Sequence, residues 1–200
     1  MIAVLRSELH RTLTVPSNWI SIGAAIVLGM SFALFSVDFW SLFVALGVFG
    51  TAVVTTTQHY QHRTAMLLFL GRPRRWVALL AQCLAATLIG LVMTAVSGVT
   101  TILSGDLAQF AGTLAAVPFL AVFGVASGTL LRRPVPLFIG YGTWFVFAEG
   151  LAFRFKQPLP FTTFMSAAGG NNPLGLLFFA GWTTLALAIA LWTIRRDLTD

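Results

Sequence analysis

The residues best suited to chemistry lie in one polar stretch, residues 58–76, between two long apolar runs. It holds two of the chain's three histidines and four of its arginines: His59, His62, Arg63, Arg72, Arg74 and Arg75. Two histidines three residues apart share a helical face, but a metal site takes more ligands than two. His10 is the only other histidine and no carboxylate lies nearby. We therefore expect no metal site, and solvated or interface histidines instead.

The nucleophiles and the single lysine also lack the partners that catalysis requires. Ser97 and Ser127 each precede a glycine, but no histidine lies inside an apolar run to act as a base. The only lysine, Lys156, lies in FRFKQP and not after a glycine-rich turn, so no Walker-type phosphate loop is present. Cys83 is the sole cysteine, which excludes an intrachain disulfide. We expect a chain with no catalytic residues and no cofactor of its own.

The composition indicates a membrane protein. Hydrophobic residues make up 58% of the 200 residues and charged residues 9%, with a mean hydropathy of +0.88. A soluble domain carries roughly 25% charged residues. This length predicts a single transmembrane domain, 1–200, without a separate soluble module. The basic residues lie at the ends of apolar runs, a pattern typical of membrane topology, so we expect no nucleic-acid partner.

Hydropathy predicts an all-α polytopic fold with six transmembrane helices. A helix needs about 20 apolar residues to cross a bilayer. The candidate spans are residues 19–35, 39–57, 76–103, 107–131, 135–148 and 174–194. Between the last two, residues 153–173 are apolar in part but short and broken, which suits a re-entrant or interfacial outer hairpin before the last span.

An amphipathic helix is predicted at the N-terminus, over residues 1–15. An aliphatic stripe recurs there at helical spacing, with charged residues beside it: Ile2, Leu5, Leu9 and Leu13 in the stripe, and Arg6, Glu8 and Arg11 outside it. We expect this helix on the membrane surface. A signal peptide is the competing interpretation, but no small-residue cleavage site follows. Pro16 ends the helix, and Ser17 or Asn18 can cap the next one.

The distribution of positive charge predicts orientation. With six spans, ten of the twelve Lys and Arg residues fall on one side, and only Arg154 and Lys156 on the other. Positive residues accumulate on the cytoplasmic side. We therefore expect a multi-pass protein of the cell membrane with both termini in the cytoplasm.

Several residues near the spans are candidates for a substrate path. Glu149, near the outer end of the fifth span, either lines such a path or pairs with Arg154, or else is an interfacial charge in water. Some aromatic residues form an apolar translocation surface in one interpretation and pack against lipid or protein in the other: Phe32, Trp40, Trp144 and Phe145.

The run HYQHRTAMLLFLGRPRRWVALLAQCLAA resembles the loop between the second and third spans of type 2 ABC exporter permeases, especially the short actinobacterial form. The family pattern is close to E-Y-R-H-G-T, an apolar stretch, P-x-R and then A-K. The family's glutamate, glycine and lysine fall here on His59, Arg63 and Gln82. The fifth span, ending in AEG before PLPF, resembles the family's outer hairpin through Glu149 and Pro160. The matching positions of the loop are Tyr60, His62, Thr64, Pro73, Arg74 and Ala81.

The resemblance implies a permease that works in a dimer, homomeric or heteromeric, with a separate ATPase subunit that binds ATP and Mg. Drugs, peptides or lipid-like molecules would be its substrates. Residues 1–15 would be the interface helix, with Arg6, Glu8 and Arg11, and residues 58–75 the cytoplasmic coupling segment. The implied ATPase contacts are Tyr60, Gln61, His62, Arg63, Thr64, Arg72, Pro73 and Arg74, with Arg132 and Arg133 as a smaller second contact.

Two alternatives stay open from the residues alone. The basic stretch can anchor topology without contacting a partner, because inner loops are routinely basic. A six-span binding or scaffold subunit, for example a vitamin-capturing one, can also lack an exporter-type ATPase. The position of the basic stretch, between the second and third spans, favours the coupling interpretation.

Overall fold

The computed structural model describes residues 2–61 and 75–196, and these residues form helices and no strand. The predicted all-α class is therefore confirmed. The elements are α1 (Ile2–Thr14), α2 (Pro16–Ala33), α3 (Val37–Gln61), α5 (Arg75–Ser97), α6 (Val99–Leu103), α7 (Leu107–Leu131), α8 (Pro134–Thr143), the π-helix η1 (Trp144–Ala152), α9 (Pro160–Ala168) and α10 (Pro173–Arg196).

Five helical segments of the described chain are long and apolar enough to cross a membrane. The apolar part of α2, Asn18–Ala33, is shorter. Six spans were predicted, so the structure confirms a helical chain with several membrane-length segments and leaves the sixth as a prediction. The five are Val37–Gln58, Trp76–Ser97, Leu107–Leu131, Pro134–Ala152 and Pro173–Ile194.

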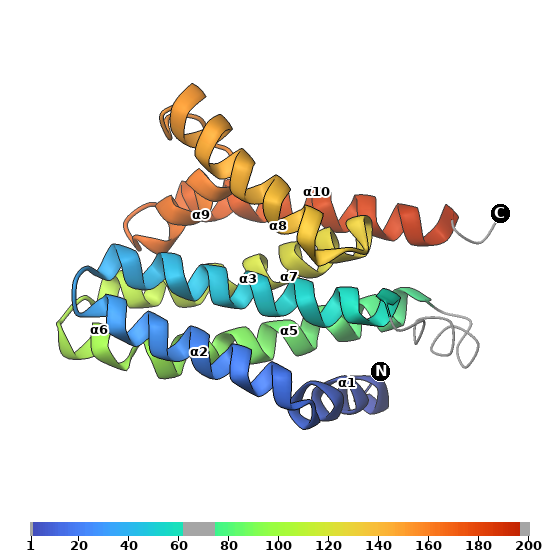
Figure 1. Ribbon diagram of the computed structural model, residues 1–200. Helices are drawn as coiled ribbons and strands as arrows, with labels where there is room; N and C mark the ends of the chain where they lie inside the picture. Colours follow the sequence, from blue (N-terminus) through green and yellow to red (C-terminus); the bar gives the residue numbers. More distant parts are fainter. Residues whose placement is uncertain (1, 62–74, 197–200) are drawn as a thin grey trace.

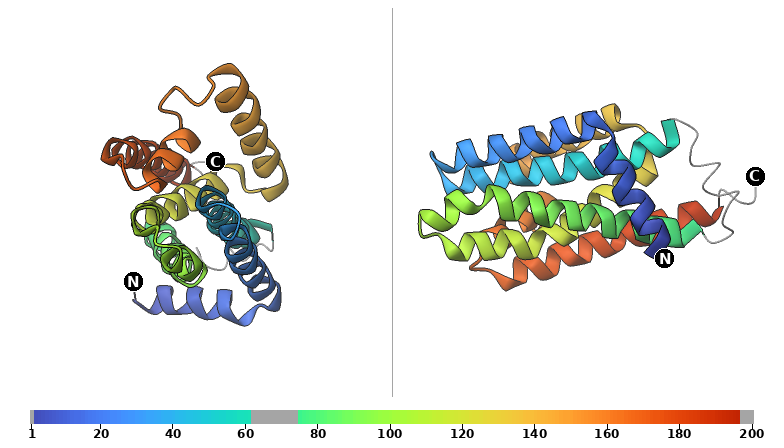
Figure 2. Two further views of the ribbon diagram at one scale, coloured as in Figure 1. Left: turned by 90° about the vertical axis from the view of Figure 1, so that its left-hand side faces the viewer. Right: turned by 90° about the horizontal axis from the view of Figure 1, so that it is seen from below.

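The long helices lie side by side in one bundle. Figure 1 shows α2, α3, α5, α7 and α10 running alongside one another, while α8 and η1 lean away. Helix α1 crosses the bundle at one end, and α10 ends toward the same end (Figures 1 and 2). The turns at 34–36, 104–106 and 169–172 lie at the opposite end.

Helix α7 is the centre of the bundle because small residues allow its neighbours to approach closely. It packs against α3, α5, α9 and α10, and 61% of its most apolar window is buried. A Cβ added at Gly124 would lie 2.9 Å from the Cβ of Ala52, and one added at Gly128 would lie 3.2 Å from the Cβ of Thr56. Small residues at such contacts are typical of helices that associate in a membrane.

The third predicted span is broken at one residue. Helix α5 ends at Ser97, and α6 continues after Gly98. A Cβ at Gly98 would lie 2.5 Å from the ring of Phe110, so this ring occupies the space that any side chain would need. The break lets α7 begin close against the end of α5.

The predicted role of Asn18 as a cap of the second helix is wrong. Val15 is the N-cap of α2, without a side-chain hydrogen bond, and Pro16 takes the first helical position. Asn18 instead donates its Nδ2 to the carbonyl of Thr12, at 3.3 Å, near the end of α1. Its amide therefore secures the corner between α1 and α2.

The fifth predicted span, 135–148, is longer in the structure. Helix α8 passes into the π-helix η1, which ends at Ala152. The Phe153 N–H bonds the carbonyl of Ala148, five residues back, as in a π-turn. Glu149 thus lies inside the helical element.

Candidate functional site

Most residues of the predicted coupling segment lie outside the described residues. These are His62, Arg63, Thr64, Arg72, Pro73 and Arg74. The backbone of Tyr60 and Gln61 closes α3, and their side chains are also outside the described set.

The predicted second contact, Arg132 and Arg133, forms the turn between α7 and α8. Both side chains are exposed. Arg132 is the C-cap of α7. Its φ of 54° is left-handed, and its N–H donates to the carbonyl of Gly128. Pro134 then takes the first position of α8. The turn therefore presents two cations from a backbone fixed on both sides.

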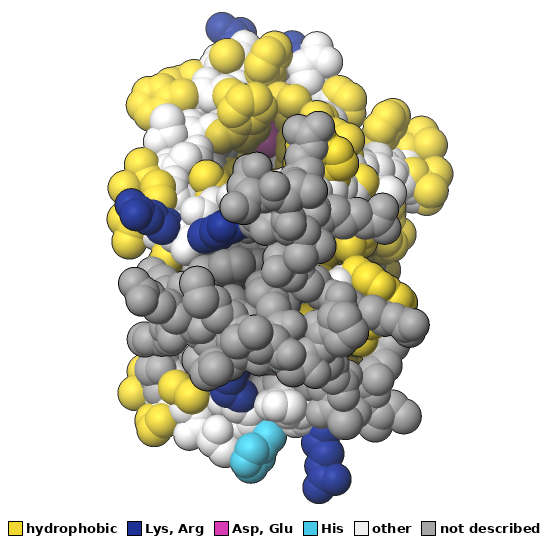
Figure 3. Space-filling view, turned by 90° about the vertical axis from the view of Figure 1, so that its right-hand side faces the viewer, with side chains coloured by type: hydrophobic (Ala, Val, Ile, Leu, Met, Phe, Trp, Pro, Cys, Tyr) yellow, Lys and Arg dark blue, Asp and Glu magenta, His cyan; other side chains and the backbone are white. Residues whose placement is uncertain are grey.

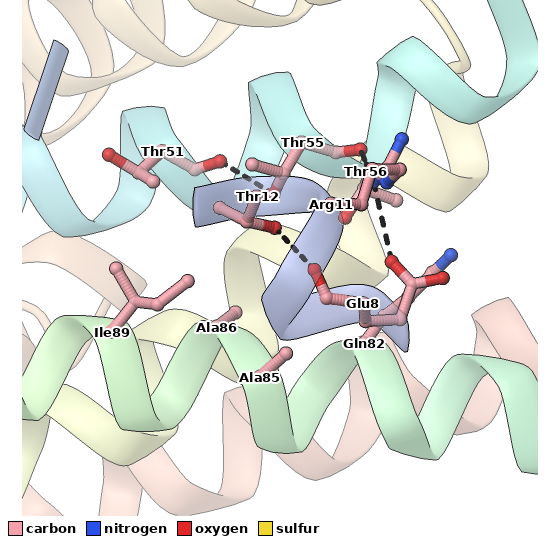
Figure 4. A pocket seen from close by; sticks show the side chains of 10 residues that line it. All are labelled: Glu8, Arg11, Thr12, Thr51, Thr55, Thr56, Gln82, Ala85, Ala86 and Ile89. Atoms are coloured by element: carbon pink, nitrogen blue, oxygen red, sulfur yellow. Dashed lines mark hydrogen bonds and ion pairs between the residues drawn. The ribbon is translucent and has the colours of Figure 1, made fainter. Parts of the chain in front are cut away.

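Helix α1 is tied to α3 through a polar junction (Figure 4). Arg11 Nη2 donates to Glu8 Oε2 at 3.3 Å and to the carbonyl oxygen of Thr55 at 3.2 Å. Glu8 is buried and Arg11 is partly exposed. A buried carboxylate needs such donors to offset its lost hydration. Arg11 therefore neutralises Glu8 and joins the two helices at once.

The same junction includes α5. Thr51, Thr56 and Gln82 line the small pocket around Glu8 and Arg11. The hydroxyl of Thr12 donates to the Glu8 carbonyl at 2.9 Å. Arg6, the other cation predicted on this helix, is exposed. The described part of α1 thus has one face in contact with the bundle and at least one cation on its free side.

A second polar site surrounds Glu149, whose side chain is completely buried. Its Oε1 accepts from Trp144 Nε1 and from the N–H of Phe161, both at 3.1 Å. Its Oε2 accepts from the N–H of Thr162 at 2.6 Å and from the Thr162 hydroxyl at 2.7 Å. All four groups donate to the carboxylate, which is the arrangement that satisfies a buried anion.

The Glu149 carboxylate acts as the N-terminal cap of α9. Phe161 and Thr162 follow Pro160, so their N–H groups are two of those that a helix start leaves without intrahelical partners. A negative charge there also interacts favourably with the helix dipole. Its burial rules out an interfacial charge in water, and no ion pair joins Glu149 to Arg154, although both are described.

Helix α9 is also held by contacts with α7 and α10 at both of its ends. The Thr113 hydroxyl of α7 donates to the carbonyl of Ala168 at 3.3 Å. Trp182 Nε1 of α10 donates to the carbonyl of Pro158, just before α9, at 2.9 Å. Glu149 therefore adds the connection to η1, whereas the remaining contacts fix α9 to α7 and α10.

An apolar cavity of about 190 Å³ lies between α3, α8, η1 and α9. Its walls come from four helices and from one residue of α7, and none of the lining residues is charged. The lining residues are Leu42, Ala45, Leu46, Phe49, Leu120, Phe138, Tyr141, Gly142, Phe145, Phe161, Phe164 and Met165.

The structure brings together only some of the residues predicted for a substrate path. Phe145 lines the cavity, and Trp144 bonds Glu149 beside it. Phe32 instead stacks on Phe43, with ring centroids 3.9 Å apart. Trp40 is completely buried, and its Nε1 donates to Ser97 Oγ at 3.3 Å. Phe32 and Trp40 thus pack against other side chains of the bundle and do not line the cavity.

Sequence reasoning missed most of the cavity and the partner of Glu149. Phe49, Tyr141 and Phe164 come from three separate helices, and no spacing in the sequence connects them. The role of the Thr162 N–H could have been predicted, because Leu-Pro at 159–160 is a helix-start signal. The N–H groups that follow such a start need an acceptor.

No family model, characterised protein or solved structure matches this chain. Among the described residues, no group of three or more His, Cys, Asp or Glu side chains is placed to hold a metal ion.

The capping role of Glu149 is testable with Glu149→Gln. Glutamine has nearly the same size but a single acceptor oxygen, so at least one of the two backbone N–H groups, that of Phe161 or that of Thr162, loses its acceptor. We expect the amides of Phe161 and Thr162 to exchange deuterium faster, and the chain to lose about 1–3 kcal/mol of stability. Trp144→Phe removes one donor only and should have the smaller effect. Unchanged exchange at the start of α9 in Glu149→Gln would contradict the assignment.

Proposed function

We propose that the chain is the membrane-spanning permease subunit of an ATP-driven ABC exporter, which works with a separate ATPase subunit and a second permease. The observation that carries the proposal is that three candidate contact regions lie toward the same end of the bundle. Helix α1, the end of α3 that leads into residues 62–74, and the α7–α8 turn lie toward one end of the bundle (Figure 1). A single partner docked at that end could contact all three.

The charges of the two ends support this orientation. The turns at 34–36, 104–106 and 169–172 contain no Lys or Arg, and Asp106 lies in the second. The segment between η1 and α9, which we place on the same side, carries two cations, Arg154 and Lys156. At the opposite end, cationic and histidine side chains are exposed among the described residues: Arg6 and His10 on α1, and Arg132 and Arg133 in the α7–α8 turn (Figure 3). Positive charge marks the cytoplasmic side, so we place α1, both termini and the ATPase contacts there.

We assign α2 as the sixth span. It lies alongside α3 over much of that helix, and a Cβ at Gly47 would lie 2.6 Å from the Cβ of Ala25. An 18-residue helix is about 27 Å long, close to the roughly 30 Å hydrocarbon core of a bilayer. In this topology α9 enters from the outer side as a re-entrant element, and the cell membrane is the location.

The junction in Figure 4 suggests how movement would pass from the partner to the membrane helices. A conformational change reaches distant helices only through contacts that hold in both states. Arg11 links α1 to the carbonyl of Thr55 on α3, and α1 also packs on α5. The two helices that flank residues 62–74, α3 and α5, are therefore both in contact with the proposed interface helix α1. A displacement of α1 by the partner would move both of them.

The orientation can be tested with a reporter that is active only in the cytoplasm. Fused after Asp200, it should be active. Inserted between Gly105 and Asp106, it should be inactive, because this turn lies at the opposite end of the bundle. Activity at the second position in a chain that inserts at normal levels would contradict the six-span topology.

The partner contact can be tested by removing two charges from the α7–α8 turn. The variant carries Arg132→Asn and Arg133→Gln. Asparagine is chosen at 132 because it adopts the left-handed φ of 54° more readily than most other residues do. We expect recovery of the ATPase subunit in affinity purification to fall about tenfold or more, since a lost charged contact at an interface can cost 2–5 kcal/mol. Insertion should be normal, because the other cytoplasmic arginines remain.

The chain offers a matched control for this change. Arg154 also has a left-handed φ, of 50°, and with Lys156 it forms the two-cation pair that we place outside. Arg154→Asn with Lys156→Gln removes the same charge and should leave ATPase recovery unchanged. Equal recovery with both double variants, at wild-type level, would mean that Arg132 and Arg133 only anchor topology.

A further inference from the structure

The lining of the cavity has a uniform chemical character. Six of its twelve lining residues are aromatic and none is charged. Its only hydroxyl belongs to Tyr141, whose Oη already lies within hydrogen-bond distance, 2.9 Å, of Ser127 Oγ. Such a surface offers dispersion and aromatic contacts, and it offers an ionic ligand nothing to offset its lost hydration.

The aromatic side chains are arranged as a connected cluster. Phe161 of α9 meets Tyr141, Phe145 and Phe49 edge to face, with ring centroids 5.7, 5.6 and 6.4 Å apart. Ring edges and faces are therefore both presented around one space. A further ring would find the same edge-to-face geometry that these residues make with one another.

The volume sets the size of the ligand. An engineered apolar cavity of about 150 Å³ takes up benzene. The cavity here, at about 190 Å³, is somewhat larger. One ring, or two fused rings, is the size that this comparison supports.

The surroundings indicate the route by which a ligand arrives. Only 11% of the segment formed by α8 and η1 is buried, and Ile139, Val146 and Phe147 are exposed on it. In a bilayer this segment faces acyl chains over much of its length. A molecule dissolved in the bilayer could pass beside α8 into the cavity without crossing water.

We propose that this cavity binds an uncharged, apolar molecule of one or two rings taken from the bilayer. As the substrate site of an exporter it rests on the proposed function, but binding itself requires this chain alone. The α9 wall of the site, with Phe161 and Phe164, is held toward η1 by the Glu149 carboxylate.

The test uses the purified chain in lipid nanodiscs with an aryl diazirine, a benzene-sized photoactivated probe. Labelled peptides are mapped by mass spectrometry, with naphthalene as competitor. Labelling within residues 42–49 and 161–165 should saturate and be displaced by naphthalene. Labelling on the exposed face of α10, at Leu177 and Phe178, should rise linearly with probe and resist competition, because lipid contact has no fixed number of sites.

Two glycines of α8 provide a matched pair of variants. A Cβ added at Gly140 or at Gly142 meets nothing within 4 Å, so both positions accept a side chain, but only Gly142 lines the cavity. Gly142→Phe should reduce the displaceable labelling about tenfold or more, and Gly140→Phe should leave it within about twofold of wild type.

Three other outcomes of the labelling experiment would overturn the proposed binding site. Labelling of the cavity peptides that never saturates in the wild-type chain would show ordinary lipid exposure. Equal displaceable labelling in both glycine variants would place the bound probe elsewhere. Preferential labelling of these peptides by a phospholipid with a diazirine in its acyl chain, undisturbed by naphthalene, would make the occupant a lipid tail. No ATPase takes part in this experiment. A negative labelling result would therefore leave the proposed ATPase partner untouched, and loss of the partner proposal would leave the binding site untouched.

Discussion

The capping of α9 by Glu149 is the interaction on which the end of the bundle opposite α1 depends. A short helix that starts among apolar side chains leaves N–H groups without partners, and in a bilayer each such group costs several kcal/mol. Glu149 supplies acceptors for two of these N–H groups and for two side-chain donors. The interaction is mutual, because the same donors are what allow a carboxylate to be buried there at all.

The opposite end of the bundle is organised around a different polar contact. There Arg11 satisfies Glu8 and reaches a main-chain oxygen of α3, so that α1 lies against the bundle through one charged pair and not through an apolar stripe alone. Helix α8 and η1 connect the two regions. The segment starts at the exposed turn of Arg132 and Arg133 and contains Glu149 near its other end. In the proposed permease, this segment is the shortest covalent path from an ATPase contact to the wall of the cavity.

Hydropathy predicted the regular parts of the fold well. The fourth predicted span, 107–131, coincides with α7, and the N-terminal helix differs from the prediction by little. These elements follow from local sequence, because an apolar run of sufficient length has few alternatives to a helix. The close approach at Gly98 was not predictable, since it involves the ring of Phe110 from the next long helix.

The candidate sites were less predictable for the same reason. Glu149 stood out as a charge beside a span, but its partners on α9 lie twelve and thirteen residues further on and become neighbours only when α9 folds back. Trp40 and Phe145 look alike in the sequence as aromatics near spans. Packing places Trp40 against Ser97 in the core and Phe145 on the cavity. Which aromatic residue faces a ligand is decided by tertiary contacts that spacing does not encode.

The most direct test of the proposed function is a measurement of ATP hydrolysis in lipid nanodiscs. The proteins to compare are this chain alone, the ATP-binding protein that purifies with it, and the two together. A permease subunit should hydrolyse no ATP by itself, because its only lysine lies outside any phosphate loop. It should change the rate of its partner several-fold when both are present. Hydrolysis by the chain alone, or a partner whose rate is the same with and without it, would contradict the proposal.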